Sequence, residues 1–527
     1  MALVLAGLVA AMAEGHEDET HQGRVWLADD GTVAAVTRTG QTEPAGFTNA
    51  HRLDLGTKVI YPGLVDLHSH LGYNTMPLWA DPGQSTAYLH HDIWPGEDTY
   101  KPELSWPAWV LAEFAPESML AYVQVRALAG GTTTIQGWPS ASRPATNSLV
   151  RSVDNDAVGP LNDPVRVSSL TMKREDLRNR ASNLRDGRIF IYHCAEGQPG
   201  SIVTREFDDL DTTGCLHERL VATHTCALDA THYQRWRAAV SPPAGRAAGT
   251  VVWSPFSNLW LYGMTTDVPA AKAAGLTVCL GTDWGPSGTR NLLGELKVAR
   301  QHSASHGWNL TDHDLVRMVT SAPGDALARA WQTPIGRLVP GALGDVVVVA
   351  RRTDDPWTNL VTAREEDVQL VVVGSQPRWG TTALMKAAGV PAITTTAVPM
   401  GRARRRVTLV RPDDPSRTWT WTDVRARLNA VRTTAASQPP AGPAGSRAGG
   451  AGPVRAPTVG DPPGTPPMVV KLDMPGGPQA SAGPPPKGQT VQIPPIEPIH
   501  HNPKWLRTIR GRGFHGGALD GLAAAFR

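Results

Sequence analysis

Two histidines stand one residue apart at the end of an apolar run, in the stretch "KVIYPGLVDLHSHL" from Lys58 to Leu71. Side chains alternate along a β-strand, so His68 and His70 point to the same side while Ser69 points away. Two imidazoles aimed at one point hold a divalent metal when further ligands reach it from elsewhere. Because 17 histidines in 527 residues can produce such a pair by chance, its meaning depends on the rest of the chain.

Three later strand-like runs also end in side chains that can bind a metal or move a proton. The run "RIFIYHCAEG" supplies His193 and Glu196. The runs "LVATHTC" and "LTVCLGTDWGPSG" supply His224 and Asp283. Any one of these residues alone is more simply a buried histidine or a turn aspartate. If the runs are successive strands of one barrel, however, their carboxyl ends meet where barrel enzymes keep their active sites. Together the strand ends indicate one metal-dependent active site.

The strands that must position these residues lie between about residues 60 and 330. Apolar runs rich in Val, Ile, Leu and Thr alternate there with helical stretches, of which Pro116–Gly131 is one. This alternation is typical of parallel strands buried on both faces of an α/β fold. Residues 1–60 and 331–385 instead show strand-turn-strand patterns, with a turn at Asp30-Gly31. We expect these two flanking stretches to build one small sheet jointly.

The two ends of the chain need separate interpretation. The apolar start "MALVLAGLVAAMAEG" imitates a signal peptide but has no Lys or Arg before its apolar core, so it is interpreted as a strand pairing with Arg24–Arg38. Further along, Thr418–Arg432 predicts a helix capped by Thr or Asp. Residues 435–495 are rich in Pro, Gly, Ala and Ser and are interpreted mostly as linker. Apolar spacing returns in residues 496–527, which we expect to dock on the body.

Composition argues against several classes of protein. The chain has 50 Lys and Arg against 48 Asp and Glu, a formal charge of +2, which gives no indication of a nucleic-acid partner. No apolar run approaches the length of a membrane span. The cysteines lack C-x-x-C spacing, which disfavours disulfide staples and a structural zinc site and makes a reducing cytoplasm the expectation. These cysteines are Cys194, Cys215, Cys226 and Cys279.

Five motifs of the chain stand out together: "PGLVDLHSHL", "HCAE", "SPFSNLWLYG", "LGTDWGPSG" and "IGRLVPGALGDVVVV". They resemble the amidohydrolase superfamily, in particular its branch of guanine and cytosine deaminases and triazine chlorohydrolases. The resemblance covers roughly residues 3 to 385. It implies an α/β fold, a (β/α)8 TIM-type barrel that carries a small composite β-sandwich domain. The expected organisation is a first sandwich part in 1–60, a barrel in 61–330, a second sandwich part in 331–385, an extension with a helix in 386–434, a linker in 435–495 and a docking segment in 496–527.

The same resemblance implies a role for each residue of the site. The implied ligands of one divalent metal are His68, His70, His193 and Asp283. Three imidazoles and a carboxylate suit Zn²⁺ first, with Fe²⁺ as the alternative. A metal-bound hydroxide would attack an sp² carbon, and Asp283 would take up the proton of the water. Glu196 matches the family's proton shuttle, and His224 would orient the water or stabilise charge on the substrate.

A few residues depart from the family pattern or leave two interpretations open. Trp284 stands where the branch commonly has a small or polar residue, and it would narrow the pocket or stack on an aromatic substrate. Ser287 contacts the substrate or shapes a turn. Lys173 fits the start of a helix better than a carboxylated bridging ligand, so one metal is expected. The histidines at positions 90 and 91 line the pocket or are solvated, and Trp94–Trp106 is a lid or a packed surface loop.

The sequence therefore predicts a metal-dependent hydrolase that acts on carbon–nitrogen bonds other than peptide bonds. The expected substrate is a small, cyclic, nitrogen-containing molecule that is deaminated or opened. A hydrolytic dehalogenase on the same site and a non-catalytic scaffold with this fold are the alternatives, because fold does not choose the reaction. The only partners expected are the small-molecule substrate and, by family analogy, a second copy in a homodimer; neither nucleic acid nor a membrane is expected.

Overall fold

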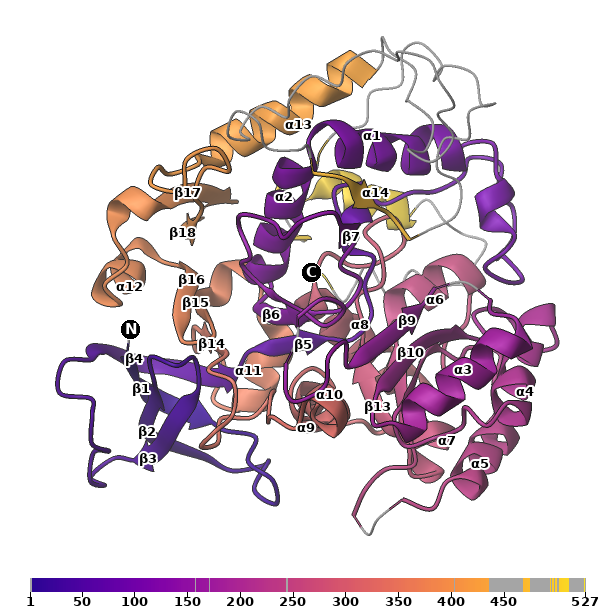
Figure 1. Cartoon of the computed structure of the whole chain (residues 1–527), viewed down its shortest axis with the longest axis horizontal. Helices are drawn as coiled ribbons and strands as arrows, with labels where there is room; N and C mark the ends of the chain where they lie inside the picture. The colour runs from indigo at the N-terminus through magenta and orange to yellow at the C-terminus, as the bar shows by residue number, and fades with distance from the viewer. Residues whose placement is uncertain are drawn as a thin grey trace.

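The computed structural model describes residues 2–156, 158–169, 171–242, 245–401, 403–435, 468–473, 493, 495–496, 498–499, 502–510 and 526. Within these residues the chain forms a mixed α/β fold with one large sheet and two parallel sheets (Figure 1). Parallel strands buried on both faces are present as predicted: strand Ile189–Cys194, for example, is buried at every position.

The large sheet takes its strands from two distant parts of the chain, residues 3–62 and 346–408. Strand β1 (Leu3–Ala10) pairs antiparallel with β2 (Thr20–Leu27) and parallel with β4 (His51–Pro62), which confirms the strand interpretation of the apolar start. Strand β14 (Val346–Val349) then pairs antiparallel with β4 on its other edge. The strand order is β17-β18-β16-β15-β14-β4-β1-β2-β3. The remaining bounds are Val33–Arg38 (β3), Val368–Val373 (β15), Gln376–Gly380 (β16), Thr395–Met400 (β17) and Ala403–Thr408 (β18).

The two parallel sheets lie beside this sheet and carry the predicted site. One has the order β5-β6-β8 and the other β13-β12-β11-β10-β9. An isolated parallel bridge between Ser69 and Asp283 links the chain just beyond β5 to the chain just beyond β13. The bounds are Leu64–Asp66 (β5), Thr132–Ile135 (β6), Arg151–Ser152 (β8), Val165–Ser168 (β9), Ile189–Cys194 (β10), Leu220–His224 (β11), Thr250–Trp253 (β12) and Thr277–Leu280 (β13).

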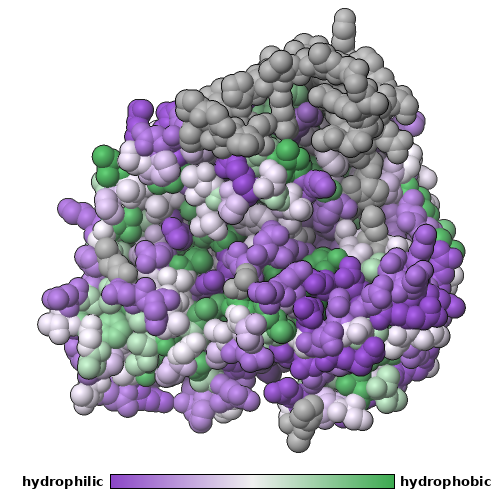
Figure 2. Space-filling model, viewed as in Figure 1, coloured by the Kyte–Doolittle hydropathy of each residue, from purple (hydrophilic) through white to green (hydrophobic). Residues whose placement is uncertain are grey.

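Helices connect the parallel strands and cover them. The predicted helix at Pro116–Gly131 is confirmed as α2 (Pro116–Ala129), and Gly131 follows it with φ +83°, a left-handed conformation that glycine adopts without strain. Lys173 precedes α3 (Arg174–Arg185) as its N-cap, so it opens a helix as predicted. In Figure 2 hydrophilic side chains gather over the region of α3, α4 and α5, whose apolar residues face inward.

The other helices of this body run as follows: α1 Trp106–Phe114, α4 Arg205–Thr212, α5 Ala230–Ala239, α6 Pro255–Tyr262, α7 Val268–Ala273, α8 Leu292–His306, α9 Asp312–Arg317, α10 Ser321–Trp331, α11 Pro356–Thr362 and α12 Thr382–Ala387. Shorter helical turns are η1 Leu71–Tyr73, η2 Trp94–Gly96, η3 Lys101–Ser105, η4 Ile202–Thr204, η5 Glu365–Asp367 and η6 Ala392–Thr394. No described helix has the length and apolar character needed to cross a membrane.

The C-terminal part of the chain returns to this body. The helix predicted at 418–432 is confirmed as α13 (Trp421–Ala435), and Thr420 caps it, since the Asp423 N–H donates to Thr420 Oγ1 at 3.1 Å. Strand β19 (Val470–Lys471) pairs with β7 (Ser140–Ala141), and α14 runs from Pro503 to Arg510. Most of the predicted linker at 435–495 lies outside the described residues.

Candidate metal centre

The predicted ligands lie at or just beyond the carboxyl ends of the parallel strands. His193 is in β10 and His224 ends β11, and the register of the two strands pairs His193 with Thr223. Asp283 follows β13 by three residues. His224 and Asp283 have backbone φ angles of 66° and 55°, in the left-handed region that residues other than glycine seldom adopt. Such strain persists where the surrounding structure fixes it, and it concentrates at functional sites.

The H-x-H motif is held against the strand end that carries the aspartate. The Asp283 N–H donates to the His68 carbonyl at 2.9 Å, and the His70 N–H donates to the Asp283 carbonyl at 3.2 Å. Asp66 supports the same junction from below, because its carboxylate accepts the Thr282 hydroxyl at 2.6 Å. These backbone contacts fix how the two histidines face the aspartate.

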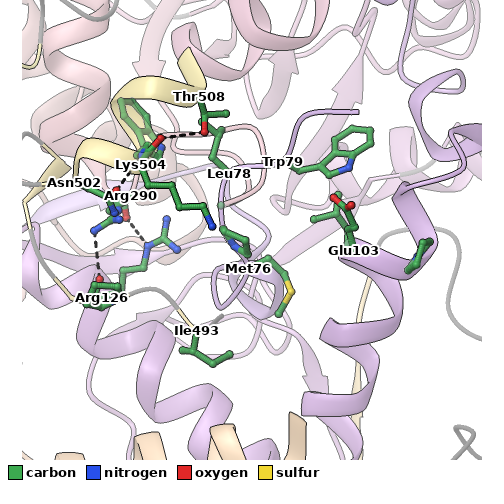
Figure 3. A pocket seen from close by; sticks show the side chains of 16 residues that line it. Met76, Leu78, Trp79, Glu103, Arg126, Arg290, Ile493, Asn502, Lys504 and Thr508 are labelled. Atoms are coloured by element: carbon green, nitrogen blue, oxygen red, sulfur yellow. Dashed lines mark hydrogen bonds between the residues drawn. The ribbon is translucent and has the colours of Figure 1, made fainter. Parts of the chain in front are cut away.

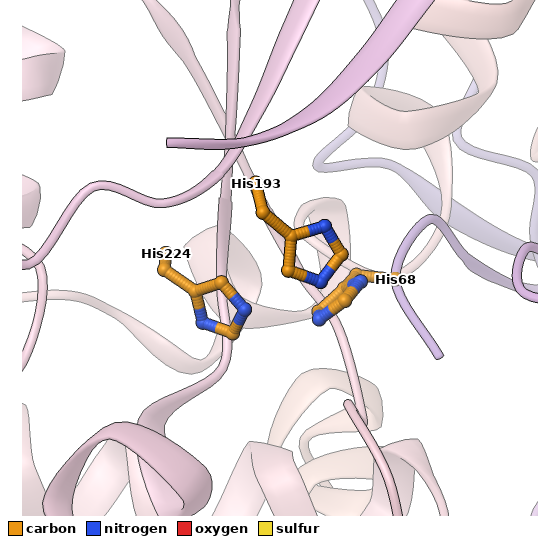
Figure 4. A group of neighbouring side chains, drawn as sticks. All are labelled: His68, His193 and His224. Atoms are coloured by element: carbon orange, nitrogen blue, oxygen red, sulfur yellow. The ribbon is translucent and has the colours of Figure 1, made fainter. Parts of the chain in front are cut away.

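The side chains of the predicted ligands converge on one point. His70 Nε2 lies 3.3 Å from His193 Nε2 and 3.5 Å from Asp283 Oδ1, while His68 Nε2 lies 3.2 Å from the same oxygen. Figure 4 shows the imidazoles of His68, His193 and His224 grouped together. Ligand atoms within 4.8 Å of one another form three overlapping buried groups: His68, His193 and His224; His68, His70 and Asp283; and Glu196, His224 and Asp283.

The hydrogen bonding of His68 is what a metal ligand would show. Its side chain is fully buried, and neither ring nitrogen has a well-directed hydrogen bond among the described residues, although Nε2 lies 3.2 Å from Asp283 Oδ1. Buried polar atoms are nearly always paired, and an unpaired one costs free energy. A divalent cation at the point where the nitrogens meet would satisfy this imidazole, so the residues fit a metal.

The second ring nitrogen of two histidines fixes which nitrogen faces the centre. His70 Nδ1 lies 2.8 Å from the Asp473 carboxylate, and His193 Nδ1 lies 3.3 Å from the Ser168 carbonyl. Both partners are acceptors, so in the neutral form of each ring Nδ1 carries the proton and Nε2 turns its lone pair to the centre. This is the arrangement of metal-binding imidazoles, whose outer nitrogen donates to an oxygen.

His224 has the opposite hydrogen bonding. The Trp253 indole donates to Thr265 Oγ1 at 2.6 Å, so the Thr265 hydroxyl donates onward to Asn258 Oδ1 at 3.3 Å. The Asn258 amide nitrogen therefore donates to His224 Nδ1 at 3.0 Å. The neutral ring then carries its proton on Nε2, which faces the centre as a donor and not as a ligand. His224 thus differs from His70 and His193 in chemistry as well as in position.

Electrostatics keep most of the centre in the ionisation state that metal binding requires. Burial lowers the pKa of His193 and of His224 well below the usual histidine value, and the neighbouring imidazoles lower it further. Burial opposes ionisation of Asp283, but His68 and the other histidines hold its pKa below the usual value. The Asp473 carboxylate outweighs burial at His70 and raises its pKa to about 9. A cation would have to displace the second proton of His70, on Nε2, before this nitrogen could bind it.

Glu196 lies beside the centre with the properties of a proton carrier. The Tyr262 hydroxyl donates to its Oε1 at 2.6 Å, and its Oε2 lies 3.6 Å from His224 Nε2. Burial and the charge of Asp283 raise the pKa of Glu196 well above the usual value. A carboxyl whose pKa is raised in this way holds its proton more firmly and is suited to act as a general acid. His91 also reaches this residue, with Nδ1 3.6 Å from Glu196 Oε2, so it lines the site.

The two residues predicted to contact substrate are packed inside the protein. Trp284 is 1% exposed, and its ring lies 5.0 Å from that of Trp94 and 5.8 Å from that of Tyr73. The buried Ser287 hydroxyl lies 2.7 Å from the Ser257 hydroxyl. The backbone N–H of Ser287 donates to the Trp284 carbonyl. Trp94 comes from the stretch 94–106, which packs as a covering layer over Trp284.

Three contacting residues were missed from the sequence, Tyr262, Asn258 and Asp473, and a fourth, His91, was left with two interpretations. Tyr262 and Asn258 lie in the motif "SPFSNLWLYG", whose spacing along one helix, α6, was a usable signal. His91 belongs to an adjacent histidine pair that was left open. Asp473 had the weakest signal: the alternation in "MVVKLD" inside a Pro/Gly-rich region. Its contact with His70 joins residues 403 positions apart.

Comparison with known proteins agrees with this geometry. No family model matches the chain. The chain is 25% identical over 397 residues to a 5-methylthioadenosine/S-adenosylhomocysteine deaminase of Syntrophobacter fumaroxidans, covering 65% of this chain and 85% of that protein. It is 26% identical over 362 residues to a deaminase of the same description from Haloquadratum walsbyi, covering 62% and 78%.

Solved structures with the same fold include zinc-bound enzymes. An adenosine deaminase from Xanthomonas campestris with bound zinc has a TM-score of 0.52 and 18% identity, over 71% of this chain and 92% of that one. An atrazine chlorohydrolase from Arthrobacter aurescens complexed with zinc and atraton has a TM-score of 0.56 and 17% identity, over 71% and 94%. These similarities concern the fold, and they agree with the resemblance predicted from the motifs.

Proposed function

We propose that this chain, a member of the deaminase and chlorohydrolase branch of the amidohydrolase superfamily, is a metal-dependent hydrolase of carbon–nitrogen bonds other than peptide bonds. Its substrate in this proposal is a small cyclic molecule that contains nitrogen. One observation carries the proposal: the buried side chains of His68, His70, His193 and Asp283 come together from distant strand ends, beside a glutamate whose pKa burial raises.

The arrangement of strands supports a (β/α)8 barrel with a composite sheet domain. The strands of the two parallel sheets follow one another in chain order from β5 to β13, apart from the short β7, and the bridge between Ser69 and Asp283 connects the first strand to the last. Ligands from the carboxyl ends of such strands then lie at one mouth of the barrel. The sheet shared by β4 and β14 supports the composite domain built from 1–60 and 331–385.

The histidine hydrogen bonds support one metal with four protein ligands: His68, His70, His193 and Asp283. Zinc is our first candidate, because imidazole and carboxylate ligands suit it and two structures of the same fold bind zinc. Fe²⁺ remains the alternative. A divalent cation held there supplies Lewis acidity and lowers the pKa of an attacking water.

The other polar residues have proton-transfer roles in this proposal. Asp283 accepts the proton that the attacking water loses. Glu196, held by the Tyr262 hydroxyl, protonates a ring nitrogen of the substrate. It then takes the proton of the hydroxyl group added to the carbon and passes it to the leaving group, and the proton on Asp283 finally returns to Glu196. His224 presents an N–H on Nε2, which stabilises negative charge developing on the oxygen that attacks.

Deamination is our first candidate reaction within this class. The curated relatives that match in sequence share a deaminase description, whereas the chlorohydrolase matches in fold alone. Opening of a cyclic amide uses the same attack on an sp² carbon, and release of chloride is the third candidate. The buried ring nitrogens of His68 argue against a scaffold without catalysis, because without a metal they would lie unpaired in the interior.

The test uses the full chain loaded with zinc and the same protein stripped by a chelator. Metal content is measured by elemental analysis, and both samples are assayed with aminopurines, aminopyrimidines, cyclic amides and chlorotriazines. Ammonia, ring opening and chloride are scored separately. We expect one zinc per chain and ammonia release from an amino-heterocycle only in the loaded sample. Absence of stoichiometric metal, or no turnover of any compound by the loaded sample, would overturn the proposal.

A further inference from the structure

A cavity lies under the C-terminal helix α14, and none of the proposed metal ligands lines it. Its volume is about 410 Å³ (Figure 3). Its walls come from the loop after η1, from η3, from α2 and from α14. The lining residues are Met76, Pro77, Leu78, Trp79, Pro102, Glu103, Leu104, Arg126, Gly285, Arg290, Ile493, Pro495, Asn502, Lys504, Trp505 and Thr508. A cavity of this size holds a small organic molecule.

The charges in the wall are mostly positive. Arg126, Arg290 and Lys504 line the cavity against a single carboxylate, Glu103. In Figure 3 the Arg126 and Lys504 side chains extend from different elements, α2 and α14, towards the same part of the cavity, and Glu103 lies near Trp79 on the other side. Like charges that face one cavity repel each other, and an anion between them would offset that repulsion.

Arg126 is the strongest indication of a missing anion. The side chain is 6% exposed, and its guanidinium donates to two carbonyl oxygens, that of Arg290 at 3.2 Å and that of Asn74. Burial lowers the pKa of Arg126 to about 10, which still leaves it charged at neutral pH. The Glu365 carboxylate acts on Arg126 electrostatically but accepts from Asn291 at 3.1 Å, and Arg126 forms no ion pair within the described part of the chain. Buried charges are usually neutralised by a partner of opposite sign.

The rest of the wall is apolar and aromatic. Met76, Trp79 and Ile493 line the cavity, and Trp505 adds an indole that stacks on Phe256 at 5.2 Å. Such a wall favours a ring or a short alkyl group over a hydrated ion. We propose that this cavity binds a small organic anion, whose phosphate or carboxylate group lies between Arg126 and Lys504 while its apolar body lies against Met76, Ile493 and Trp505.

This site is distinct from the metal centre but is connected to it through one residue. Asn74 accepts from Arg126 on its carbonyl, and its Oδ1 accepts the Gly285 N–H at 2.6 Å. Its amide nitrogen donates to Ser69 Oγ at 3.2 Å, between the two histidines of the H-x-H motif. The inference goes beyond the proposed hydrolase function, and it does not depend on a metal being bound.

Calorimetric titration of the full chain tests the proposal with four probes: phenyl phosphate, inorganic phosphate, benzoate and neutral benzyl alcohol. We expect saturable binding of phenyl phosphate or benzoate, weaker binding of inorganic phosphate and none of benzyl alcohol. The phenyl phosphate and benzoate titrations together show whether the site takes a phosphate or a carboxylate. Titrations with and without zinc should agree.

Two variants of α14 provide the matched comparison. Both residues are exposed on α14, but only Lys504 lines the cavity, so Lys504→Gln removes a cation from its wall and Arg507→Gln removes one from elsewhere on the helix. We expect Lys504→Gln to weaken binding about tenfold and Arg507→Gln to leave it unchanged. Arg126→Gln should abolish binding. Because Arg126 is buried, this variant can fail to fold, and in that case the comparison of Lys504→Gln with Arg507→Gln tests the proposal. Equal affinities for both α14 variants, equal binding of benzyl alcohol, or no saturable binding would overturn the proposal.

Discussion

The metal centre and the C-terminal segment that reaches it are built in different ways. The centre takes its side chains from strand ends between residues 68 and 283, where backbone pairing between neighbouring strands sets each position. The C-terminal segment joins the body through β19, which pairs with β7, and its Asp473 touches His70 from outside the centre. Strand ends therefore provide the atoms that do chemistry, and the added segment adjusts them. Changes in the first region should abolish function, and changes in the second should weaken it.

The largest effect is expected for Asp283, the residue with both a ligand role and a proton role. Replacing it with Asn should remove stoichiometric zinc and reduce kcat/KM by about 1,000-fold or more, because the site loses its only anionic ligand. Elemental analysis and the deaminase assay measure the two effects. Asp354→Asn, at a fully exposed aspartate, is the control and should change neither. Full zinc content in Asp283→Asn would remove Asp283 from the ligand set.

The next effect separates proton transfer from metal binding. Glu196→Gln keeps the shape of the side chain and the contact with Tyr262 but cannot carry a proton, so kcat should fall about 100- to 10,000-fold. Zinc content should stay at the wild-type level. If the zinc is lost instead, Glu196 is a ligand, and the division between the two kinds of residue at the centre is wrong.

The same division explains what could be predicted from the sequence. The period of a strand predicts that His68 and His70 share a side, and alternation of strands with helices predicts that strand ends meet, so the structure brings the expected side chains together. Local pattern does not report which nitrogen of a histidine carries the proton. That depends on neighbours such as Asn258, which becomes a partner of His224 only after folding.

Contacts between distant segments were beyond reach for a different reason. Asp473 follows a stretch whose Pro- and Gly-rich composition predicts a linker, and nothing local indicates that it ends at His70. The packing of Trp284 could not be predicted either, because its neighbours are distant in sequence: Tyr73 follows the H-x-H motif, and Trp94 and Tyr100 belong to the stretch 94–106. In both cases the missing information is the path of a loop, which has no repeating pattern.

A change at Asn258 tests the proton position on His224. Asn258→Asp replaces a donor with an acceptor of the same shape, so Nδ1 must carry the proton and Nε2 of the neutral ring loses its own. We expect kcat to fall about 100-fold, since a wrong tautomer removes a donor from the site. Zinc content and thermal unfolding, measured alongside, should show that the centre is still assembled. Unchanged kcat would mean that His224 does not act through its Nε2 proton.

The smallest effect is expected at the C-terminal segment. Asp473→Asn keeps β19 and most of the side-chain volume but removes the charge that faces His70 Nδ1 at 2.8 Å. Outer partners of ligating histidines typically change metal affinity about 10- to 100-fold, and the exposed side of this aspartate favours the lower figure. Zinc affinity is measured by competition with a chelator, and kcat at saturating zinc should change little. Lys471→Gln, on the same strand, is the matched control and should bind zinc as the wild type does.

If Asp473→Asn and Lys471→Gln bind zinc equally well, the C-terminal segment covers the centre without adjusting it. If instead Asp473→Asn loses zinc as completely as Asp283→Asn, the segment belongs to the centre itself and the contrast between the two regions fails.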